Sequence, residues 1–371
     1  MRIAISCHPT QGGSGVVATE LAMALGDRDH DVHLVSDERP FRLDDDAPLE
    51  FHRVNVTDYP LFRYPPHDLC LANQLADLVI ERDIQIIHAH YAVPHAVSAM
   101  LAADIVQPHP VKVVTTVHGT DITLVGSHHD FYRVCRHAMS RCDGLTAVSQ
   151  WLCDRTQEEF DLPVAPHVIP NFVDCDRFTA DNHDIDENTD ELILLHASNF
   201  RPVKRVCDVV RVFAAVQHHT PARLMMVGDG PERGLAGELA AELGIADRVD
   251  FVGPQFDMGD VYRNAHIFLL LSDYESFGLS ALEALACGTP VVASRSGGLI
   301  EVVEDHVTGR LCPVGQIQQI ADAVLGIWAD RAAWRQMSDT APKAARRVYC
   351  KDKIVPQYEK FYEGILHAAQ V

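Results

Sequence analysis

Two carboxylates eight residues apart, Glu275 and Glu283, are the residues whose types and spacing most clearly indicate chemistry. An apolar run at 266–272 precedes them, and leucines after Gly278 recur at three- and four-residue steps, which predicts a buried strand, a turn and a helix. Backbone N–H groups at the start of such a helix attract an anion. A carboxylate on each side of a phosphate site can bind the hydroxyls of a ribose or a sugar. The alternative is an ordinary strand–helix unit with two surface glutamates.

A glycine-rich loop at 12–14 joins a strand expected at 2–6 to a helix expected at 17–25. Glycines let a ligand approach the backbone at a helix N-terminus, where phosphate is favoured. The loop does not match GxGxxG, and Asp37 is a poor candidate for the acidic residue that would bind the ribose of a nicotinamide cofactor. The sequence therefore disfavours a nicotinamide oxidoreductase. A glycine turn needed only for packing stays open as an alternative.

Hydrogen-bonding side chains follow two further expected strands in the first half of the chain. Tyr91 ends the strand expected at 84–91, and His118 and Thr120 follow the strand expected at 111–117. Ligands of parallel α/β sheets bind at the carboxyl ends of the strands, so we expect a binding site at this edge. A structural role for His118 is the alternative interpretation.

Several patterns invite a metal interpretation, and we assign none of them to a metal. His88, His90 and His95 lie close in sequence, but no carboxylate or cysteine has a suitable spacing to complete a zinc site. Roles in the core, in a cleft or in acceptor binding are favoured instead. Two Asp-x-Asp patterns, at 44–46 and 174–176, lie in a polar loop and in a connecting segment.

The elements that would position these residues alternate between strand and helix in both halves of the chain. This alternation predicts an α/β protein with two Rossmann-like, doubly wound parallel sheets. We expect domains at 1–171 and 172–352, with the acidic stretch at 181–191 as a surface loop just inside the second domain. A final amphipathic helix at 353–371 has an aromatic face, but its pattern does not indicate which domain it packs on.

Composition narrows the class of protein. The chain has 371 residues, of which 47% are hydrophobic, and a net charge of −21, which disfavours nucleic acid as a partner. Ten cysteines without a CxxC pair favour a reduced, cytoplasmic protein over a disulfide framework. The chain begins on a strand-like segment and has no apolar run of membrane-spanning length, so we expect neither a signal peptide nor a membrane partner.

The segment 275–283 resembles the E-x7-E motif of retaining glycosyltransferases of the family 4 type, which have the two-domain GT-B fold. The resemblance implies two Rossmann-like domains that face a cleft. The N-terminal domain, joined by helix 353–371, would bind the acceptor, and the C-terminal domain would bind a nucleotide-sugar. It implies that Glu283 binds the ribose hydroxyls and that the catalytic residues are His118, Lys204 and Glu275. No metal or other cofactor is implied. The donor-binding residues it implies are Gly12, Gly13, Ser14, Asn199, Lys204, Ser280 and Glu283.

One departure from the family pattern points to a subfamily. Most members carry an arginine where this chain has Asn199, so the donor diphosphate loses one charge-assisted hydrogen bond, worth about 1.5–3 kcal/mol. Arg201 and Arg205 flank the position and could compensate. The asparagine is expected in the bacillithiol-pathway glycosyltransferases, which the chain resembles over its whole length. The segments that carry this likeness are 12–17, 64–66, 90–96, 115–123 and 198–205.

That likeness implies UDP-N-acetylglucosamine as donor and L-malate as acceptor, and it suggests a homodimer. Malate is a dicarboxylate with one nucleophilic hydroxyl, so its site needs cations and hydroxyl groups. Tyr91, Thr120 and Arg136 match this requirement, at two strand ends and on the next helix. Another small-molecule or glycan acceptor stays open. A non-catalytic nucleotide-sugar-binding protein is a more remote alternative.

Overall fold

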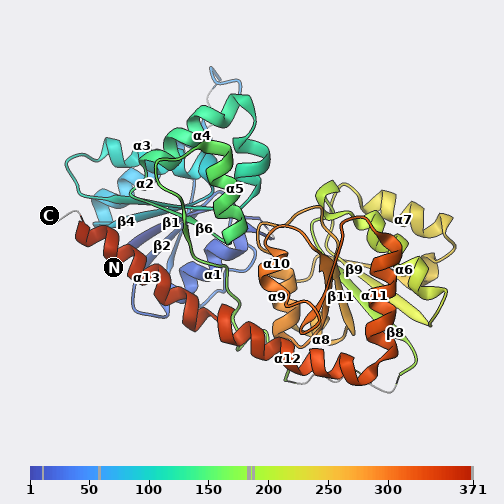
Figure 1. The fold of residues 1–371 in the computed structure, drawn as a ribbon. Coiled ribbons are helices and arrows are strands. Elements are labelled where there is room, and N and C mark those ends of the chain that lie inside the picture. Colours follow the sequence, from blue (N-terminus) through green and yellow to red (C-terminus); the bar gives the residue numbers. More distant parts are fainter. Residues whose placement is uncertain (11, 57–59, 182–184, 186–188, 369–371) are drawn as a thin grey trace. The chain divides into compact units, whose positions relative to one another are not determined.

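The computed structural model describes residues 1–10, 12–56, 60–181, 185 and 189–368, and the chain divides into two compact units (Figure 1). The first unit comprises Met1–Asn171 with Asp352–Val371, and the second comprises Phe172–Lys351. The chain therefore passes between the units after Asn171 and again after Lys351. Most of the acidic loop expected at 181–191 lies outside the described residues.

The first unit is built on a seven-stranded parallel sheet with the order β3-β2-β1-β4-β5-β6-β7. Its central strands are buried along their length, because helices cover both faces of a parallel sheet. The strands are β1 Arg2–Ser6, β2 Asp31–Ser36, β3 Glu50–Arg53, β4 Ile86–His90, β5 Lys112–Val117, β6 Gly144–Ala147 and β7 His167–Val168.

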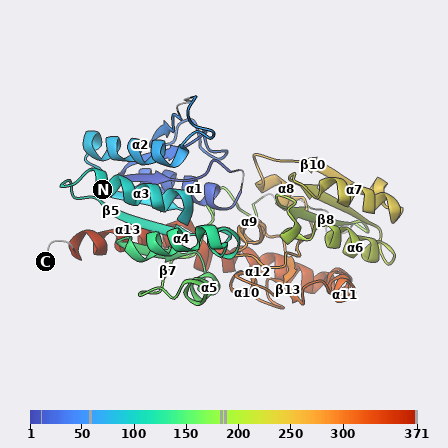
Figure 2. The same ribbon diagram turned by 90° about the horizontal axis from the view of Figure 1, so that it is seen from above.

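Helices alternate with the strands of the first unit, except that β3 follows β2 without a helix between them. Two π-helical segments, η1 Ala92–Ala96 and η2 Asp121–Gly126, come directly after β4 and β5. Helices α2 and α3 lie side by side (Figure 2). The helices are α1 Ser14–Gly26, α2 His67–Arg82, α3 Val97–Ile105, α4 His129–Arg141, α5 Gln150–Phe160 and the final helix α13 Lys351–Ala368.

The final helix packs on the first unit through its aromatic face. Tyr358 and Tyr362 are buried, and the hydroxyl of Tyr362 lies 2.7 Å from Nδ1 of His88 on β4. Arg28 forms a bidentate pair with Glu359 of the same helix at 2.8 Å. Residues from Asp352 onward therefore belong to the first unit, a question that the amphipathic pattern left open.

The second unit is built on a six-stranded parallel sheet with the order β10-β9-β8-β11-β12-β13. Trp334 and Phe213 are among the largest side chains of its core. The strands are β8 Leu192–Ala197, β9 Ala222–Val227, β10 Val249–Gly253, β11 Ile267–Leu270, β12 Val291–Ser294 and β13 Gly309–Cys312. The α-helices are α6 Val206–Gln217, α7 Arg233–Glu242, α8 Gly259–Arg263, α9 Leu279–Ala286, α10 Leu299–Val302, α11 Ile317–Ala329 and α12 Arg331–Tyr349, and the 3₁₀ turns are η3 Pro202–Lys204 and η4 Ala246–Arg248.

Strand order confirms that both sheets are doubly wound. Counted within each unit, six consecutive strands have the order 3-2-1-4-5-6, which is the order of dinucleotide-binding folds. The order reverses between β1 and β4 in the first unit and between β8 and β11 in the second. Ligands of open parallel sheets bind beyond the carboxyl ends of the strands at such switch points. The loops after these four strands are therefore the places to look for a site.

All ten cysteines are unpaired, and burial raises the pKa of the Cys7 and Cys287 thiols to about 12. In the described ranges, no helix combines the length and the apolar character needed to cross a membrane.

Candidate active site

The switch point of the second unit carries the paired carboxylate motif. Strand β11 ends at Leu270, the loop contains Glu275, and α9 begins at Leu279 after Gly278, whose φ is 99°. The predicted strand, turn and helix are thus confirmed. The first N–H groups of α9, including that of the half-buried Ser280, have no acceptor within the helix. They are available to an anion at the end of β11.

Lys204 and Glu275 lie together at this switch point. Nζ of Lys204, in the turn after β8, donates to Oε1 of Glu275 at 2.5 Å. The hydroxyl of Ser272 donates to the same oxygen at 2.6 Å. The side chains of the ion pair are 20% and 12% exposed, so a ligand can reach them while much of the surrounding water is excluded. Ser272 is a contact that the motif spacing did not reveal.

A glycine pair holds the backbone of Glu275 in place. The N–H of Gly298 donates to the carbonyl of Glu275 at 2.7 Å, and a Cβ on Gly297 would lie only 2.1 Å from that carbonyl oxygen. Gly297 also has a φ of 59°, in the region that favours glycine. The loop after β12 therefore fits the position of Glu275 only with glycine at 297.

Replacing Gly297 with alanine should displace Glu275 and lower kcat/KM by about tenfold or more, since small misplacements of positioning groups are costly. Gly244 is a matched control, because its φ is 70° and a Cβ there meets nothing within 4 Å. Both variants should lose about 1–3 kcal/mol of unfolding free energy to backbone strain. Only the Gly297 variant should lose activity; equal activity in both would disprove the positioning role.

Glu283 is the buried member of the motif. It lies on α9 and is 3% exposed, and the hydroxyl of Tyr262, on α8, donates to its Oε2 at 3.0 Å. A buried carboxylate is suited to binding hydroxyl groups of a ligand, because its oxygens accept hydrogen bonds. Tyr262 has no signal in the motif and was missed in the sequence.

The guanidinium of Arg205 is engaged by two carboxylates. Its Nε donates to Asp208 at 2.7 Å, and its Nη1 donates to Asp273 at 2.8 Å. These two carboxylates occupy the guanidinium, so the idea that Arg205 compensates for Asn199 is disfavoured. Asn199 and Arg201 are exposed, and compensation by Arg201 stays a prediction.

At the switch point of the first unit, the glycine-rich loop follows β1 and leads into α1. Gly12 and Gly13 are exposed, and Gly13 precedes Ser14 with a φ of 62°. A Cβ on Gly15 would lie 2.4 Å from the carbonyl oxygen of His8, so this glycine is required for packing. Packing is thus shown for Gly15 in α1, while a ligand-binding role of Gly12, Gly13 and Ser14 stays a prediction. These three residues lie at the end of α1 that attracts anions.

His118 is connected to a buried group of histidines. Its Nε2 lies 3.0 Å from Nδ1 of His90, and the ring of His90 packs against that of His88 with centroids 4.3 Å apart. Burial lowers the pKa of His118 and of His88 to about 3, so both rings are neutral at pH 7. A neutral His118 offers hydrogen bonds rather than a charge to a ligand.

Asp121 fixes the backbone around His118. One oxygen accepts from the N–H groups of His118 at 3.0 Å and Gly119 at 2.7 Å, and the other accepts from Ala92 at 3.3 Å. Burial raises the pKa of this carboxyl to about 6, against the effect of the backbone donors. Sequence reasoning missed Asp121, although its place after the His-Gly turn is a usable signal.

The pH dependence of stability should reveal the neutral histidines. The folded pKa values of His88 and His118 lie below the unfolded value of 6.5, so unfolding takes up protons as the pH falls from about 6.5 towards 3. Each residue should lower the unfolding free energy by up to about 1.4 kcal/mol per pH unit in that window. We expect urea unfolding to show this loss below pH 6.5, and H88Q to lessen its slope. A wild-type stability that is level from pH 7 to 5 would contradict the assignment.

Two of the predicted acceptor residues lie in contact. The hydroxyl oxygen of Tyr91, after β4, lies 2.6 Å from Oγ1 of Thr120, after β5. Tyr91 has a φ of 105°, a strained conformation for a residue with a side chain, which is typical of functional sites. The rings of His8 and Tyr91 pack edge to face, with centroids 5.2 Å apart.

Comparison with known proteins agrees with this arrangement. A family model described as Glycosyltransferase Family 4 matches residues 11–177, and one described as Glycosyl transferases group 1 matches residues 178–344. N-acetyl-alpha-D-glucosaminyl L-malate synthase of Bacillus anthracis is 40% identical over 373 residues, which cover 99% of this chain and 97% of that protein. The chain therefore belongs to the glycosyltransferases of the family 4 type.

Other proteins are similar in sequence over a smaller part of this chain, or share only its fold. D-inositol 3-phosphate glycosyltransferase of Saccharomonospora viridis is 34% identical over 48% of this chain and 49% of its own. HepE of Anabaena, solved in complex with UDP-glucose, superposes with a TM-score of 0.83 at 20% identity, over 98% of this chain and 100% of its own. Sucrose-phosphate synthase of Thermosynechococcus elongatus superposes with a TM-score of 0.82 at 21% sequence identity, over 99% of this chain and 100% of its own. Together with the two Rossmann-like sheets, these likenesses show the GT-B fold.

The third predicted acceptor residue of the glycosyltransferase has structural partners. Nε of Arg136, on α4, donates to the carbonyl of Phe160 at 2.8 Å, and Nη2 donates to that of Asp161 at 3.0 Å. These bonds satisfy carbonyls at the end of α5. A role of Arg136 in acceptor binding stays a prediction. It would depend on the guanidinium N–H groups that do not donate to these two carbonyls.

The histidines considered for a metal have other partners. His88 lies 2.7 Å from Thr116, His90 contacts His118, and Nδ1 of His95 lies 2.6 Å from the hydroxyl of Ser6. Of the described residues, the groups with the spacing of metal ligands are His33–Glu50–His52 and His128–His129–Asp130, neither of which includes them.

Proposed function

We propose that this glycosyltransferase transfers N-acetylglucosamine from UDP-N-acetylglucosamine to the hydroxyl of L-malate, with retention at the sugar carbon and without a metal ion. The observation that carries the proposal is the 40% identity to the malate synthase over nearly the full length of both chains. That likeness covers the first unit, where acceptor choice is expected, as well as the second. The inositol phosphate enzyme matches only about half of the chain.

The second unit would bind the donor. Glu283 would accept hydrogen bonds from the ribose hydroxyls, and its burial strengthens such bonds. Lys204 would neutralise the diphosphate as it leaves, helped by the first N–H groups of α9 near Ser280. Glu275, fixed by Lys204 and Ser272, would accept a hydrogen bond from a hexose hydroxyl.

The first unit would bind the acceptor. Tyr91 and Thr120 hold their hydroxyls 2.6 Å apart, so a malate carboxylate could replace that contact with a bond from each. Arg136 would add charge through its remaining N–H groups. His118, neutral at pH 7, would bind a sugar hydroxyl without placing a positive charge beside it.

The transfer step exchanges one bond for another at the sugar. The bond between C1 and the β-phosphate oxygen breaks, and a bond between C1 and the malate hydroxyl oxygen forms on the same face. The hydroxyl proton passes to the departing phosphate oxygen, so no protein carboxylate forms a covalent intermediate. The products are UDP and an N-acetylglucosaminyl malate with retained configuration.

A measurement of UDP release tests three parts of the proposal together: the identity of the donor, the identity of the acceptor and the independence from a metal ion. We would measure it from UDP-N-acetylglucosamine with L-malate, with succinate and with no acceptor, each with and without a chelator. Succinate is the matched control, because it keeps both carboxylates and lacks the hydroxyl. The coupling constant of the anomeric proton in the product reports the stereochemistry.

Release that requires L-malate and is indifferent to the chelator would support the proposal. Slow release that ignores malate would overturn the acceptor assignment and keep the family. Release abolished by the chelator and restored by a divalent ion would overturn the metal-free mechanism. An inverted product would overturn the retaining mechanism.

A further inference from the structure

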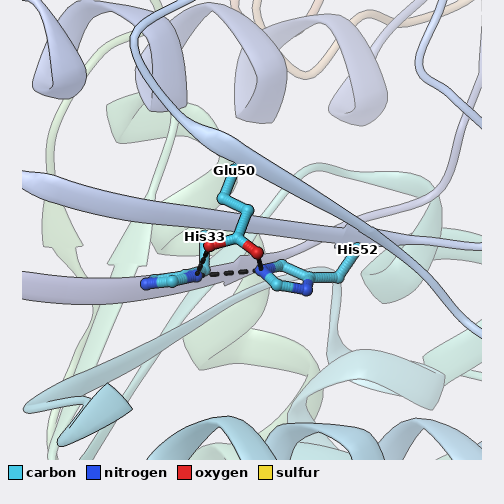
Figure 3. Close-up of side chains that lie close together, drawn as sticks. All are labelled: His33, Glu50 and His52. Carbon is cyan, nitrogen blue, oxygen red and sulfur yellow. Dashed lines mark hydrogen bonds and ion pairs between the residues drawn. The ribbon is translucent and has the colours of Figure 1, made fainter.

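Three potential metal ligands meet on the edge of the first unit's sheet, away from the carboxyl ends of the strands. His33 lies in the middle of β2, and Glu50 and His52 lie on the edge strand β3. The parallel register pairs His33 with Glu50 and Val35 with His52, so the three side chains share one face. Figure 3 shows their polar atoms directed toward a common point.

The distances between these atoms are close to those that one metal ion would impose. Nδ1 of His33 lies 2.9 Å from Nε2 of His52 and 3.7 Å from Oε2 of Glu50. Oε1 of Glu50 lies 3.8 Å from Nε2 of His52. A tetrahedral zinc ion with ligands at about 2.0–2.1 Å holds its ligand atoms about 3.3 Å apart. Shifts of about half an ångström in the side chains would therefore suffice.

The two imidazoles are shielded from water. Their side chains are 2% and 15% exposed. A neutral imidazole offers one lone pair to a metal ion. Without an ion, the 2.9 Å contact between the two imidazoles needs a proton on one of the two nitrogens. An ion would take the place of that proton.

The far side of His33 has the environment of a metal-bound histidine. Its Nε2 is buried and has no hydrogen-bond partner within the described ranges, and the carboxylate of Asp31 lies 3.4 Å away. Ligand histidines commonly direct their second nitrogen to a carboxylate, which fixes the tautomer and makes the ring a better ligand. A small movement of Asp31 would complete this arrangement.

We propose that His33, Glu50 and His52 bind one zinc ion, with water as the fourth ligand, and that the ion fastens the edge strand β3 to β2. Two imidazoles and a carboxylate are a ligand set that suits zinc. Strand β3 has four residues and, among the described strands, pairs with β2 alone, so a bond across the pair stabilises an edge of the sheet. The role is structural and does not depend on the transferase reaction.

One cation competes with the ion. Nη2 of Arg82 lies 3.2 Å from Oε1 of Glu50, and its side chain is 48% exposed. Such an exposed pair is weak, so Arg82 can turn to solvent when the ion binds. The other histidine group, His128–His129–Asp130, is exposed and consists of consecutive residues, which makes it the natural control.

The test is zinc binding by the full-length chain without a histidine tag. We would remove metals with a chelator, titrate zinc against a fluorescent indicator, and follow the Tm of the protein with zinc concentration. We expect one site per chain and a Tm that rises with zinc. His52→Ala should lower the affinity about 100-fold or more, and Asp31→Asn about tenfold. The double variant His128→Ala/His129→Ala should bind as the wild type does.

Two further variants guard against effects on folding. Glu50→Gln keeps the shape of the side chain and should also weaken binding, while Arg82→Gln removes the competing cation and should tighten it. Wild-type protein without a stoichiometric site would overturn the proposal. So would a His52→Ala variant with unchanged affinity, or a site that disappears only in the His128/His129 variant.

Discussion

Replacing Lys204 with methionine is expected to lower kcat about 10²–10³-fold in a UDP-release assay. Methionine keeps the length of the side chain and removes the charge that would stabilise the leaving diphosphate. It also leaves the carboxylate of Glu275, whose side chain is 12% exposed, without its cation and close to an anionic donor. The free energy of unfolding should change little in this variant, because the ion pair of Lys204 and Glu275 lies at the edge of the site rather than in the core.

A double-mutant cycle separates the two effects of losing Lys204. In the variant K204M/E275Q the unpaired carboxylate is gone, so part of the lost donor affinity should return while kcat stays low. The conservative variant K204R keeps the charge and should retain more activity than K204M. A K204M enzyme within about fivefold of the wild type would show that Lys204 does not stabilise the leaving group; about fivefold is only 1 kcal/mol.

Replacing Glu283 with glutamine is expected to raise the KM for the nucleotide-sugar about 10–100-fold, with a smaller change in kcat. Hydrogen bonds to a charged group contribute about 1.5–3 kcal/mol, and this carboxylate is 3% exposed, so water cannot replace it cheaply. Glutamine keeps the shape and one acceptor for the hydroxyl of Tyr262. The measurement is initial rate against donor concentration at saturating acceptor.

Tyr262→Phe is the matched control for the ribose assignment. It removes the 3.0 Å hydrogen bond to Glu283 and keeps the carboxylate itself in place. We expect a modest rise in KM from the looser carboxylate and no larger effect. A donor KM that is unchanged in E283Q, or that rises as much in Y262F, would contradict a direct role for Glu283.

The local structure around Glu275 and Glu283 could be predicted from the sequence, because it depends on neighbours along the chain. The apolar run before Glu275, the glycine at 278 and the helical spacing of the leucines each specify a strand, a turn or a helix. The alternation of such segments also predicted two doubly wound sheets. Strand order then placed the glycine loop and the paired carboxylates at switch points.

Contacts between distant segments were decided only by the tertiary structure. Lys204 and Glu275 meet across 71 positions, and Arg205, one residue further along, is bound by Asp208 and Asp273 instead. Arg136 was expected at an acceptor site, and its guanidinium reaches the end of α5. Spacing cannot separate these outcomes, since each depends on where a loop places a long, flexible side chain.

The glycines and histidines also separate what the sequence determined from what only the tertiary structure decided. The sequence by itself determined that glycines lie near the site, but only packing shows that Gly297 has no room for a Cβ beside Glu275. Its pattern drew attention to His88, His90 and His95, which the structure joins to separate partners. It gave no sign of His33, Glu50 and His52, because the register of two neighbouring strands brings them together. Local periodicity sets the elements, and the pairing of strands sets which side chains meet.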